Sequence, residues 1–244
     1  MDSIFYTTVA GVAMLAGGIA AVAGFGIGSL LTPLFALHYG MKAAVGAVAI
    51  PHLVATVLRF WRLRAHVDRR VFLTFGLMNA AGSLAGALIH VWVDSPILTV
   101  VLGILLVFAG LVGLSGYADR MRFGQTTAWL AGVLSGAFGG LVGNQGGIRS
   151  AAMLGMGIQG AAFVATATAI GIAVDVVRMP VYFATETAPI ATAAPAIVAS
   201  VLGVVLGTLA GERMLRRIPW KLFRRVVSGV LLAVGGYLLI TSSR

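Results

Sequence analysis

The chain has 244 residues, of which 59% are hydrophobic and only 10% are charged, and its mean hydropathy is +1.02. A soluble domain carries about 25% charged residues, so this composition excludes a soluble globular domain and predicts an all-α polytopic integral membrane protein. Cysteine is absent, which excludes thiol catalysis, disulfide bonds and thiolate metal sites.

The formal net charge of +10 comes from basic residues that are confined to short loops between apolar runs. This distribution is typical of the cytoplasmic face of a membrane protein, and we expect no nucleic-acid binding. The opening Met1-Asp2-Ser3 places no positive charge before the first apolar run. We therefore expect that run to be a membrane segment rather than a cleaved signal peptide.

The first half of the chain, residues 1–122, is predicted to hold five membrane elements. Their expected bounds are 4–23, 27–39, 43–60, 71–92 and 97–117. The second element is short because Gly24-Phe25-Gly26-Ile27-Gly28-Ser29 interrupts the first apolar run. A basic cluster at 59–70 follows the third element, and another at 120–122 closes this half.

The second half, residues 123–244, shows the same order of elements. Their expected bounds are 126–142, 148–158, 160–183, 191–210 and 226–240, with a basic cluster at 213–225. The break before the short element reads Gly-Gly-Leu-Val-Gly-Asn-Gln-Gly-Gly-Ile-Arg over residues 139–149. An ordinary membrane helix does not require five glycines, two amides and an arginine in one such stretch.

A shift of 121 positions aligns the two halves. It pairs Gly26-Ile27 with Gly147-Ile148, Gly82 with Gly203 and Gly86 with Gly207. Because these matches keep the order of the elements, they predict an internal duplication within one integral membrane domain.

The charge distribution predicts how the repeats are related. If the two short elements did not cross, the clusters at 62–70 and 213–225 would lie on opposite faces, against the positive-inside tendency. If each completes a crossing, there are ten elements and most Lys and Arg residues share one face. We therefore expect inverted repeats, cytoplasmic basic loops and periplasmic termini. The short elements fall below the roughly 20 residues of a full crossing, so we expect broken helices near the midplane.

The two breaks are predicted to form an anion site. The N-terminus of each short element presents unpaired N–H groups and a positive dipole end, and glycine lets a ligand approach the backbone. Arg149 adds a fixed charge with a planar donor fork, and Thr32 is a further candidate from the first half. The candidate substrate-binding residues are Gly26, Gly28, Ser29, Asn144, Gln145, Gly146, Gly147 and Arg149.

Other interpretations of these residues stay open at this point. The glycines could serve helix packing alone, with Arg149 at a membrane surface or paired with Asp175. Asp175 and Arg178 are three residues apart and can pair, but an intramembrane acid can also relay protons. His52 is either a titrating group or a packing histidine bonded to backbone. The sequence contains no motif for catalysis or for binding a metal or cofactor, so we expect none of these functions.

The stretches "GFGIGSLLTPLFAL" and "AGVLSGAFGGLVGNQGGIRSAAMLGMGI" resemble the sulfite exporter (TauE/SafE) family, also called the toluene-sulfonate uptake permease family. The resemblance implies transport of sulfite, sulfoacetate or other organosulfonates across the bacterial inner membrane. Family members typically carry a G-x-G-G-G-like motif and a nearby proline in both halves. Pro33 fits this pattern, but Leu154 stands at the matching position of the second half. Gln145 and Arg149 lie inside the matching motif, which implies a ligand role for both.

Three functions follow as hypotheses. The first is a secondary transporter of a small sulfur oxyanion, working by alternating access and driven by a gradient, since no ATP-binding sequence is present. The second is a passive anion channel, and the third is a non-transporting structural membrane subunit. The expected partners are the lipid bilayer and the oxyanion, and the glycine faces leave a homodimer open.

Overall fold

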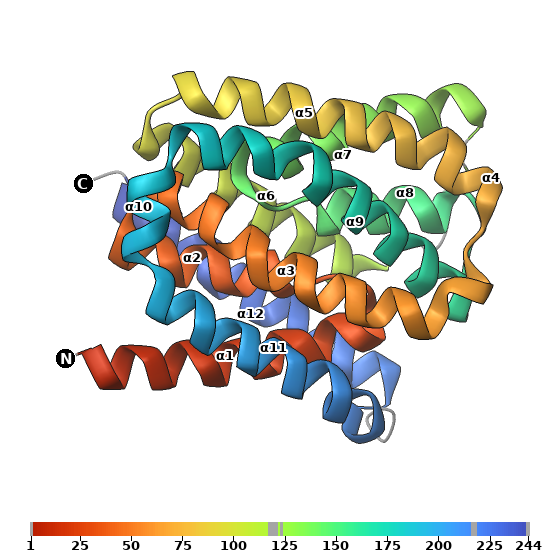
Figure 1. Cartoon of the computed structure of the whole chain (residues 1–244). Helices are drawn as coiled ribbons and strands as arrows, with labels where there is room; N and C mark the ends of the chain where they lie inside the picture. Colours follow the sequence, from red (N-terminus) through yellow and green to blue (C-terminus); the bar gives the residue numbers. More distant parts are fainter. Residues whose placement is uncertain (1, 117–121, 123, 216–218, 243–244) are drawn as a thin grey trace.

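The computed structural model describes residues 2–116, 122, 124–215 and 219–242. The first half contains α1 (Asp2–Ala23), α2 (Ile27–Tyr39), α3 (Met41–Leu63), η1 (Arg64–His66), α4 (Arg69–Val71), η2 (Phe72–Gly76), α5 (Leu77–Trp92) and α6 (Ser95–Ser115). The second half contains α7 (Gln125–Val142), α8 (Gly146–Gly155), α9 (Gly160–Thr185), α10 (Thr187–Thr192), α11 (Ala194–Leu215) and α12 (Trp220–Ser242). Figure 1 shows their arrangement in one helical bundle.

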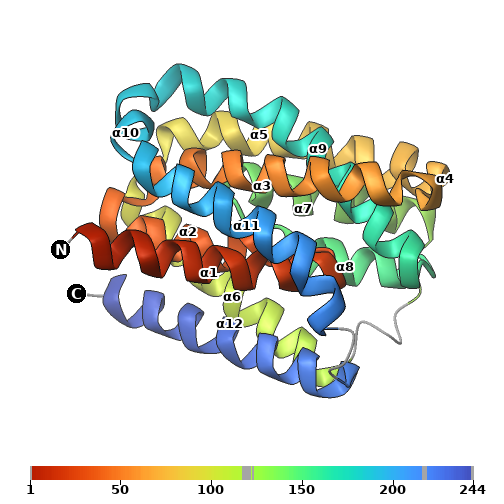
Figure 2. The ribbon, with the colours of Figure 1, turned by 60° about the horizontal axis from the view of Figure 1, so that its bottom comes forward.

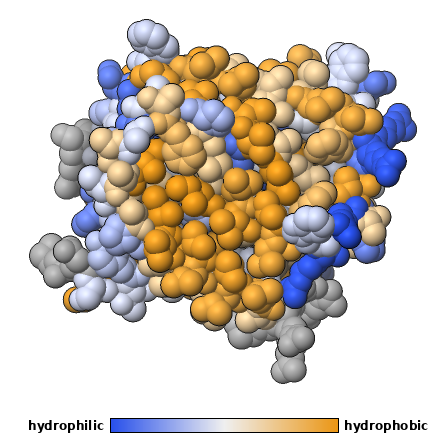
Figure 3. Space-filling view, in the orientation of Figure 1, coloured by the Kyte–Doolittle hydropathy of each residue, from blue (hydrophilic) through white to orange (hydrophobic). Residues whose placement is uncertain are grey.

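The surface of the bundle is suited to lipid. Within the described residues, seven helices are long and apolar enough to cross a membrane. Large apolar side chains are exposed along them, as with Leu15 at 63%, Leu202 at 62% and Ile240 at 63%. Figure 3 shows apolar residues across the middle of one face and hydrophilic residues at its two ends. The prediction of an all-α polytopic membrane protein is therefore confirmed.

The two halves pack against each other reciprocally. The most extensive contacts join α1 to α11, α5 to α7 and α6 to α12, each pairing one half with the other. The glycine contacts show α1 parallel to α11 and α5 parallel to α7, whereas α6 and α12 run antiparallel. The third elements of the halves, α3 and α9, also run antiparallel, because Gly46 faces Tyr182 while Thr56 faces Gly171.

Glycines bring these parallel pairs together. A Cβ on Gly86 of α5 would lie 3.0 Å from the Ala137 Cα of α7. A Cβ on Gly207 of α11 would lie 2.9 Å from the Met14 Cα of α1. The sequence shift that pairs Gly86 with Gly207 thus matches residues with equivalent packing roles. These glycine faces are used inside the chain, and the homodimer stays a prediction.

The ends of the helices separate into two groups. In Figures 1 and 2, α1 begins and α12 ends at one end of the bundle, whereas the α3–α4 turn lies at the other. Phe5 stacks on His38 with ring centroids 4.2 Å apart, so α2 returns to the end where α1 begins. The cluster at 59–70 lies at the α3–α4 end, whereas the clusters at 120–122 and 213–225 fall partly outside the described residues.

Several element bounds differ from the predicted ones. The third element continues to Leu63 instead of ending at residue 60, so the basic cluster at 59–70 begins inside a helix. The second short helix is α8, which begins at Gly146 and ends at Gly155, where 148–158 was predicted. The fourth element begins with α4 and a π-helical turn at Phe72–Gly76. The division at residues 122 and 123 stays a prediction.

We predict that the parallel α1–α11 contact is intolerant of added volume at Gly17. A Cβ there would lie 2.6 Å from the Val204 carbonyl oxygen, so Gly17→Ala should lower the free energy of unfolding. Overpacking of this kind costs about 1–3 kcal/mol. Gly11→Ala on the same helix is the matched control, because a Cβ at Gly11 meets nothing within 4 Å. Unfolding in detergent measures both variants, and equal losses would contradict the prediction.

Candidate anion-binding site

The two helix breaks meet inside the bundle. The Ser29 hydroxyl of α2 donates to Asn144 Oδ1 of the second break at 3.1 Å. Arg149 Nη2 of α8 donates to the Gly24 carbonyl of the first break at 3.0 Å. Gly28 packs against the Gly143 carbonyl so closely that a Cβ on Gly28 would collide with its oxygen atom. Two stretches that are remote in the sequence therefore form one buried unit.

Glycine backbone geometry makes the breaks. Gly26, the N-cap of α2, has a φ of 130°, and Gly143, the C-cap of α7, has a φ of 71°. Side chains other than glycine are strained at these angles. Neither Gly26 nor Gln145, the N-cap of α8, makes a side-chain cap hydrogen bond. Both short helices therefore begin with N–H groups that no capping side chain occupies.

The C-terminal carbonyls of α7 are held by side chains from two neighbouring helices. Arg178 Nη1 of α9 donates to the Gly139 carbonyl at 2.5 Å, and the Tyr182 hydroxyl donates to the Gly140 carbonyl. His90 Nδ1 of α5 donates to the Leu141 carbonyl at 2.7 Å. The Gly139 carbonyl also accepts the Gly143 backbone N–H at 3.0 Å. An unsatisfied carbonyl costs several kcal/mol in a bilayer, so the bonds from Tyr182 and His90 to the next two carbonyls stabilise the end of the helix.

A buried ionic network lies beside this helix end. Asp175 Oδ1 accepts bonds from Arg178 Nε at 3.0 Å and from Arg178 Nη2 at 2.7 Å. The predicted pair within α9 is therefore confirmed. Asp175 Oδ2 lies 2.5 Å from His52 Nδ1 of α3, so the imidazole bonds to a carboxylate and not to backbone. The network joins the two halves of the chain.

Arg149 lies inside the protein rather than at a membrane surface. Only 3% of the residue is exposed, and its hydrogen bond goes to the Gly24 carbonyl and not to Asp175. Its Nε and Nη1 have no hydrogen-bond partner among the described residues. The same holds for three further buried atoms around the breaks, which are Thr32 Oγ1, Asn144 Nδ2 and Gln145 Oε1. Buried polar atoms usually have partners, so these atoms mark a place suited to a polar ligand or water.

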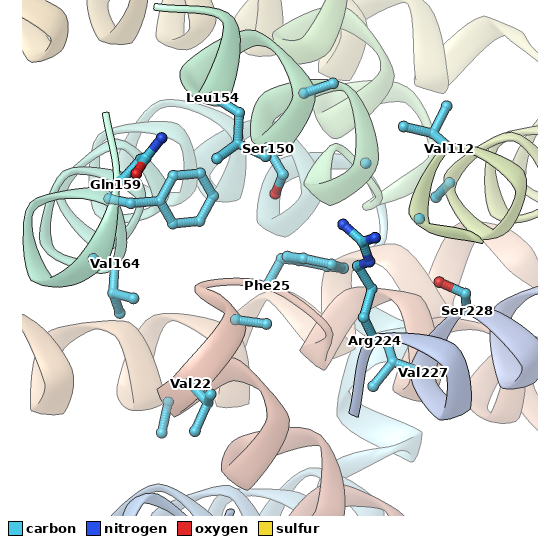
Figure 4. Close-up of a pocket in the computed structure, with 18 of the residues that line it drawn as sticks. Val22, Phe25, Val112, Ser150, Leu154, Gln159, Val164, Arg224, Val227 and Ser228 are labelled. Carbon is cyan, nitrogen blue, oxygen red and sulfur yellow. The ribbon is translucent and has the colours of Figure 1, made fainter. Parts of the chain in front are cut away.

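A cavity of about 710 Å³ reaches the breaks from the end of the bundle where α3 ends and α12 begins. Figure 4 shows the side chains of Phe25, Ser150 and Arg224 converging on this space. Arg59 and Gly147 also line it, and the rest of the lining is mainly apolar. The arrangement gives an anion a route from one end of the molecule to α8.

The predicted glycines divide into different roles. Gly28 and Gly146 serve close packing, since a Cβ on Gly146 would lie 2.8 Å from the Phe25 Cβ. Gly26 provides backbone geometry, and Gly147 lines the cavity. Sequence reasoning did not single out Tyr182, His90 or Arg59. A local pattern does not identify them, because their roles depend on contacts between distant segments.

These features define an integral membrane protein with an internal polar site, the class to which transporters belong. The chain matches the family model "Sulfite exporter TauE/SafE" over residues 9–238 and therefore belongs to that family. This confirms the resemblance carried by the glycine motifs. It also assigns the chain to a family of membrane transporters, the sulfite exporters. No curated protein and no solved structure matches the chain.

We predict that the Tyr182 hydroxyl stabilises the end of α7. Tyr182→Phe removes the donor to the Gly140 carbonyl while keeping the buried ring, and an unsatisfied buried acceptor costs about 1–3 kcal/mol. The unfolding temperature should fall accordingly. Tyr237→Phe is the control, because Tyr237 is 52% exposed and its loss of a hydroxyl should have little effect. The prediction fails if the two variants unfold alike.

Proposed function

We propose that the protein is a secondary transporter of a small sulfur-containing oxyanion, such as sulfite, sulfoacetate or another organosulfonate, across the bacterial inner membrane. The observation that carries the proposal is Arg149, a buried cation with two unpartnered nitrogen atoms at the junction of the breaks. A charge in such a place is costly unless an anion balances it. Membership of the sulfite exporter family supports this type of substrate.

The substrate would bind at the junction of α2 and α8. Its oxygen atoms would accept bonds from Arg149 Nε and Nη1 and from Asn144 Nδ2, which lack partners within the described chain. Ser29 and Gln145 would complete the polar surroundings, since both are buried at the same junction. The uncapped N-termini add two positive dipole ends. Gly26, Gly28, Gly146 and Gly147 allow the backbone approaches that form the junction.

Transport would proceed by alternating access of two inverted repeats. The antiparallel pairs α3–α9 and α6–α12 and the reciprocal parallel pairs support this relation between the halves. When two inverted halves exchange conformations, an opening on one side of the membrane becomes an opening on the other. The cavity opens at the basic end of the bundle, which we assign to the cytoplasm by the positive-inside tendency. The periplasmic position of both termini follows.

The network of His52, Asp175 and Arg178 serves structure and offers a route for coupling. It connects α3 with α9 and reaches the Gly139 carbonyl at the second break. A change of protonation at the His52–Asp175 pair would therefore act on both halves at once. We assign it the role of linking substrate binding to the movement of the halves.

We predict that Arg149→Ala abolishes sulfite binding by the purified protein and sulfite flux in proteoliposomes. Arg149→Lys should keep weak binding, because an ammonium group keeps the charge but loses the planar fork. We expect the affinity of Arg149→Lys for sulfite to be roughly tenfold to hundredfold weaker, which corresponds to the loss of one charge-assisted hydrogen bond. Arg69→Ala, which removes an exposed arginine of α4, is the control. Unchanged binding in a folded Arg149→Ala protein would overturn the site, and flux without saturation or counterflow would indicate a channel.

We predict that the two basic clusters are accessible from the same side of the membrane. Because the chain lacks cysteine, single cysteines can be introduced as His66→Cys, Lys221→Cys and Ser3→Cys, all at exposed positions. A membrane-impermeant thiol reagent should label the first two from the cytoplasm and Ser3→Cys from the periplasm. Labelling of His66→Cys and Lys221→Cys from opposite sides would refute the ten-element topology.

A further inference from the structure

Arg59 is a buried cation, although it is the first residue of the basic cluster at 59–70. It lies in α3 and is 3% exposed, whereas Arg62 and Arg64 on the following turn are exposed. Its Nε and Nη1 have no hydrogen-bond partner in the part of the chain that the structure describes. A surface arginine would satisfy these groups with water. Arg59 is therefore a costly residue that stability alone does not explain.

Buried charges around the breaks do not balance. The buried charged side chains among the described residues are three arginines, Arg59, Arg149 and Arg178, and one carboxylate, Asp175. Asp175 directs both oxygen atoms to Arg178 and His52. Arg59 and Arg149 are therefore left without an anionic partner, and the centre of the protein carries two uncompensated positive charges when the histidines are neutral.

Arg59 and Arg149 also lie at the same place in the fold. A Cβ on Gly171 would lie 3.3 Å from Thr56 Cγ2 and 3.7 Å from Arg149 Nη1, so Arg149 lies beside the face of α3 on which Arg59 follows Thr56 by three residues. Arg59 lines the cavity together with Phe25 of the first break and Gly147 and Ser150 of the α8 N-terminal turns. Arg149 follows Gly147 by two positions on α8, so it lies on the face of this helix turned away from the cavity. An anion that passed from the cavity around the N-terminus of α8 would have Arg59 of the first half and Arg149 of the second within reach.

We propose that Arg59 is the second arm of the substrate site and that the Arg59–Arg149 pair selects doubly charged sulfur oxyanions over singly charged ones. This inference rests on the proposed function, since it concerns the same site. A dianion would neutralise both uncompensated charges, whereas a monoanion would leave one buried charge unbalanced. Fully deprotonated sulfite and sulfoacetate, which carries a sulfonate and a carboxylate, belong to the favoured class. A simple alkyl sulfonate such as methanesulfonate belongs to the other.

The test measures binding of three anions to the purified full-length chain. Sulfoacetate and methanesulfonate compete against radiolabelled sulfite, and the ratio of their affinities reports charge selectivity. In the unmodified protein, sulfoacetate should bind more tightly than methanesulfonate by about tenfold to hundredfold, the equivalent of one charge-assisted hydrogen bond. Arg59→Gln should reduce this ratio to near unity by weakening sulfoacetate while changing methanesulfonate little. Arg62→Gln, which removes the exposed cavity arginine of the same helix, should preserve the ratio.

A second measurement separates a ligand role from a structural role. Without ligand, Arg59→Gln should unfold at the same temperature as the unmodified protein or at a higher one, because it removes an uncompensated buried charge. A structural arginine would instead lower the unfolding temperature when replaced. The stabilisation that sulfoacetate gives to the unmodified protein should disappear in the variant. Arg59→Met, which keeps the length of the side chain without its charge, should behave in the same way.

The outcomes distinguish this inference from the function on which it rests. If the unmodified protein binds none of the three anions, the proposed function is overturned together with this inference. If sulfite binding depends on Arg149 but the affinity ratio is the same in Arg59→Gln, only the role of Arg59 is overturned. An equal loss of selectivity in Arg62→Gln would also overturn it, because the effect would then belong to the general charge of the cavity.

Discussion

A backbone carbonyl or amide that a helix break frees inside a bilayer must find a partner, and this requirement organises the centre of the protein. Arg178, Tyr182 and His90 bind the last carbonyls of α7, and Arg149 binds the carbonyl of Gly24. These side chains come from three other helices, α9, α5 and α8. The breaks are therefore products of tertiary packing, and the same packing brings the N-termini of α2 and α8 together.

The hydrogen bonds to the freed backbone carbonyls also determine which buried charged side chains are paired. Arg178 is bonded both to Asp175 and to the Gly139 carbonyl, so the single buried carboxylate among the described residues serves the structure. Arg59, which lines the cavity, and Arg149, on the helix that borders it, keep unpartnered nitrogen atoms. In the proposed mechanism, an anion is the group that joins these two arginines of different halves. A substrate that binds more tightly when both arginines contact it favours that conformation over the others. This difference in affinity is what a ligand needs in order to change the conformation of a protein.

Glycine serves two structural purposes in this protein, and the sequence alone does not distinguish them. At Gly26 and Gly143 it permits backbone angles with positive φ, and at Gly86 and Gly207 it allows parallel helices to approach. Gly28 and Gly146, predicted as ligand contacts, serve the second purpose within the breaks themselves. Their packing holds the two breaks against each other, so they contribute to the site by forming it.

The sequence by itself determined the membrane class, the positions of the two breaks and the family, and it offered the Asp175–Arg178 pair as one of several possibilities. Hydropathy, glycine content and a spacing of three residues are local properties that need no knowledge of the fold. Only the tertiary structure decided that His52 bonds to Asp175, that Tyr182 and His90 cap α7, and that Arg59 is buried. Each of these depends on which distant segments become neighbours, and a one-residue change in helix phase would alter every such contact.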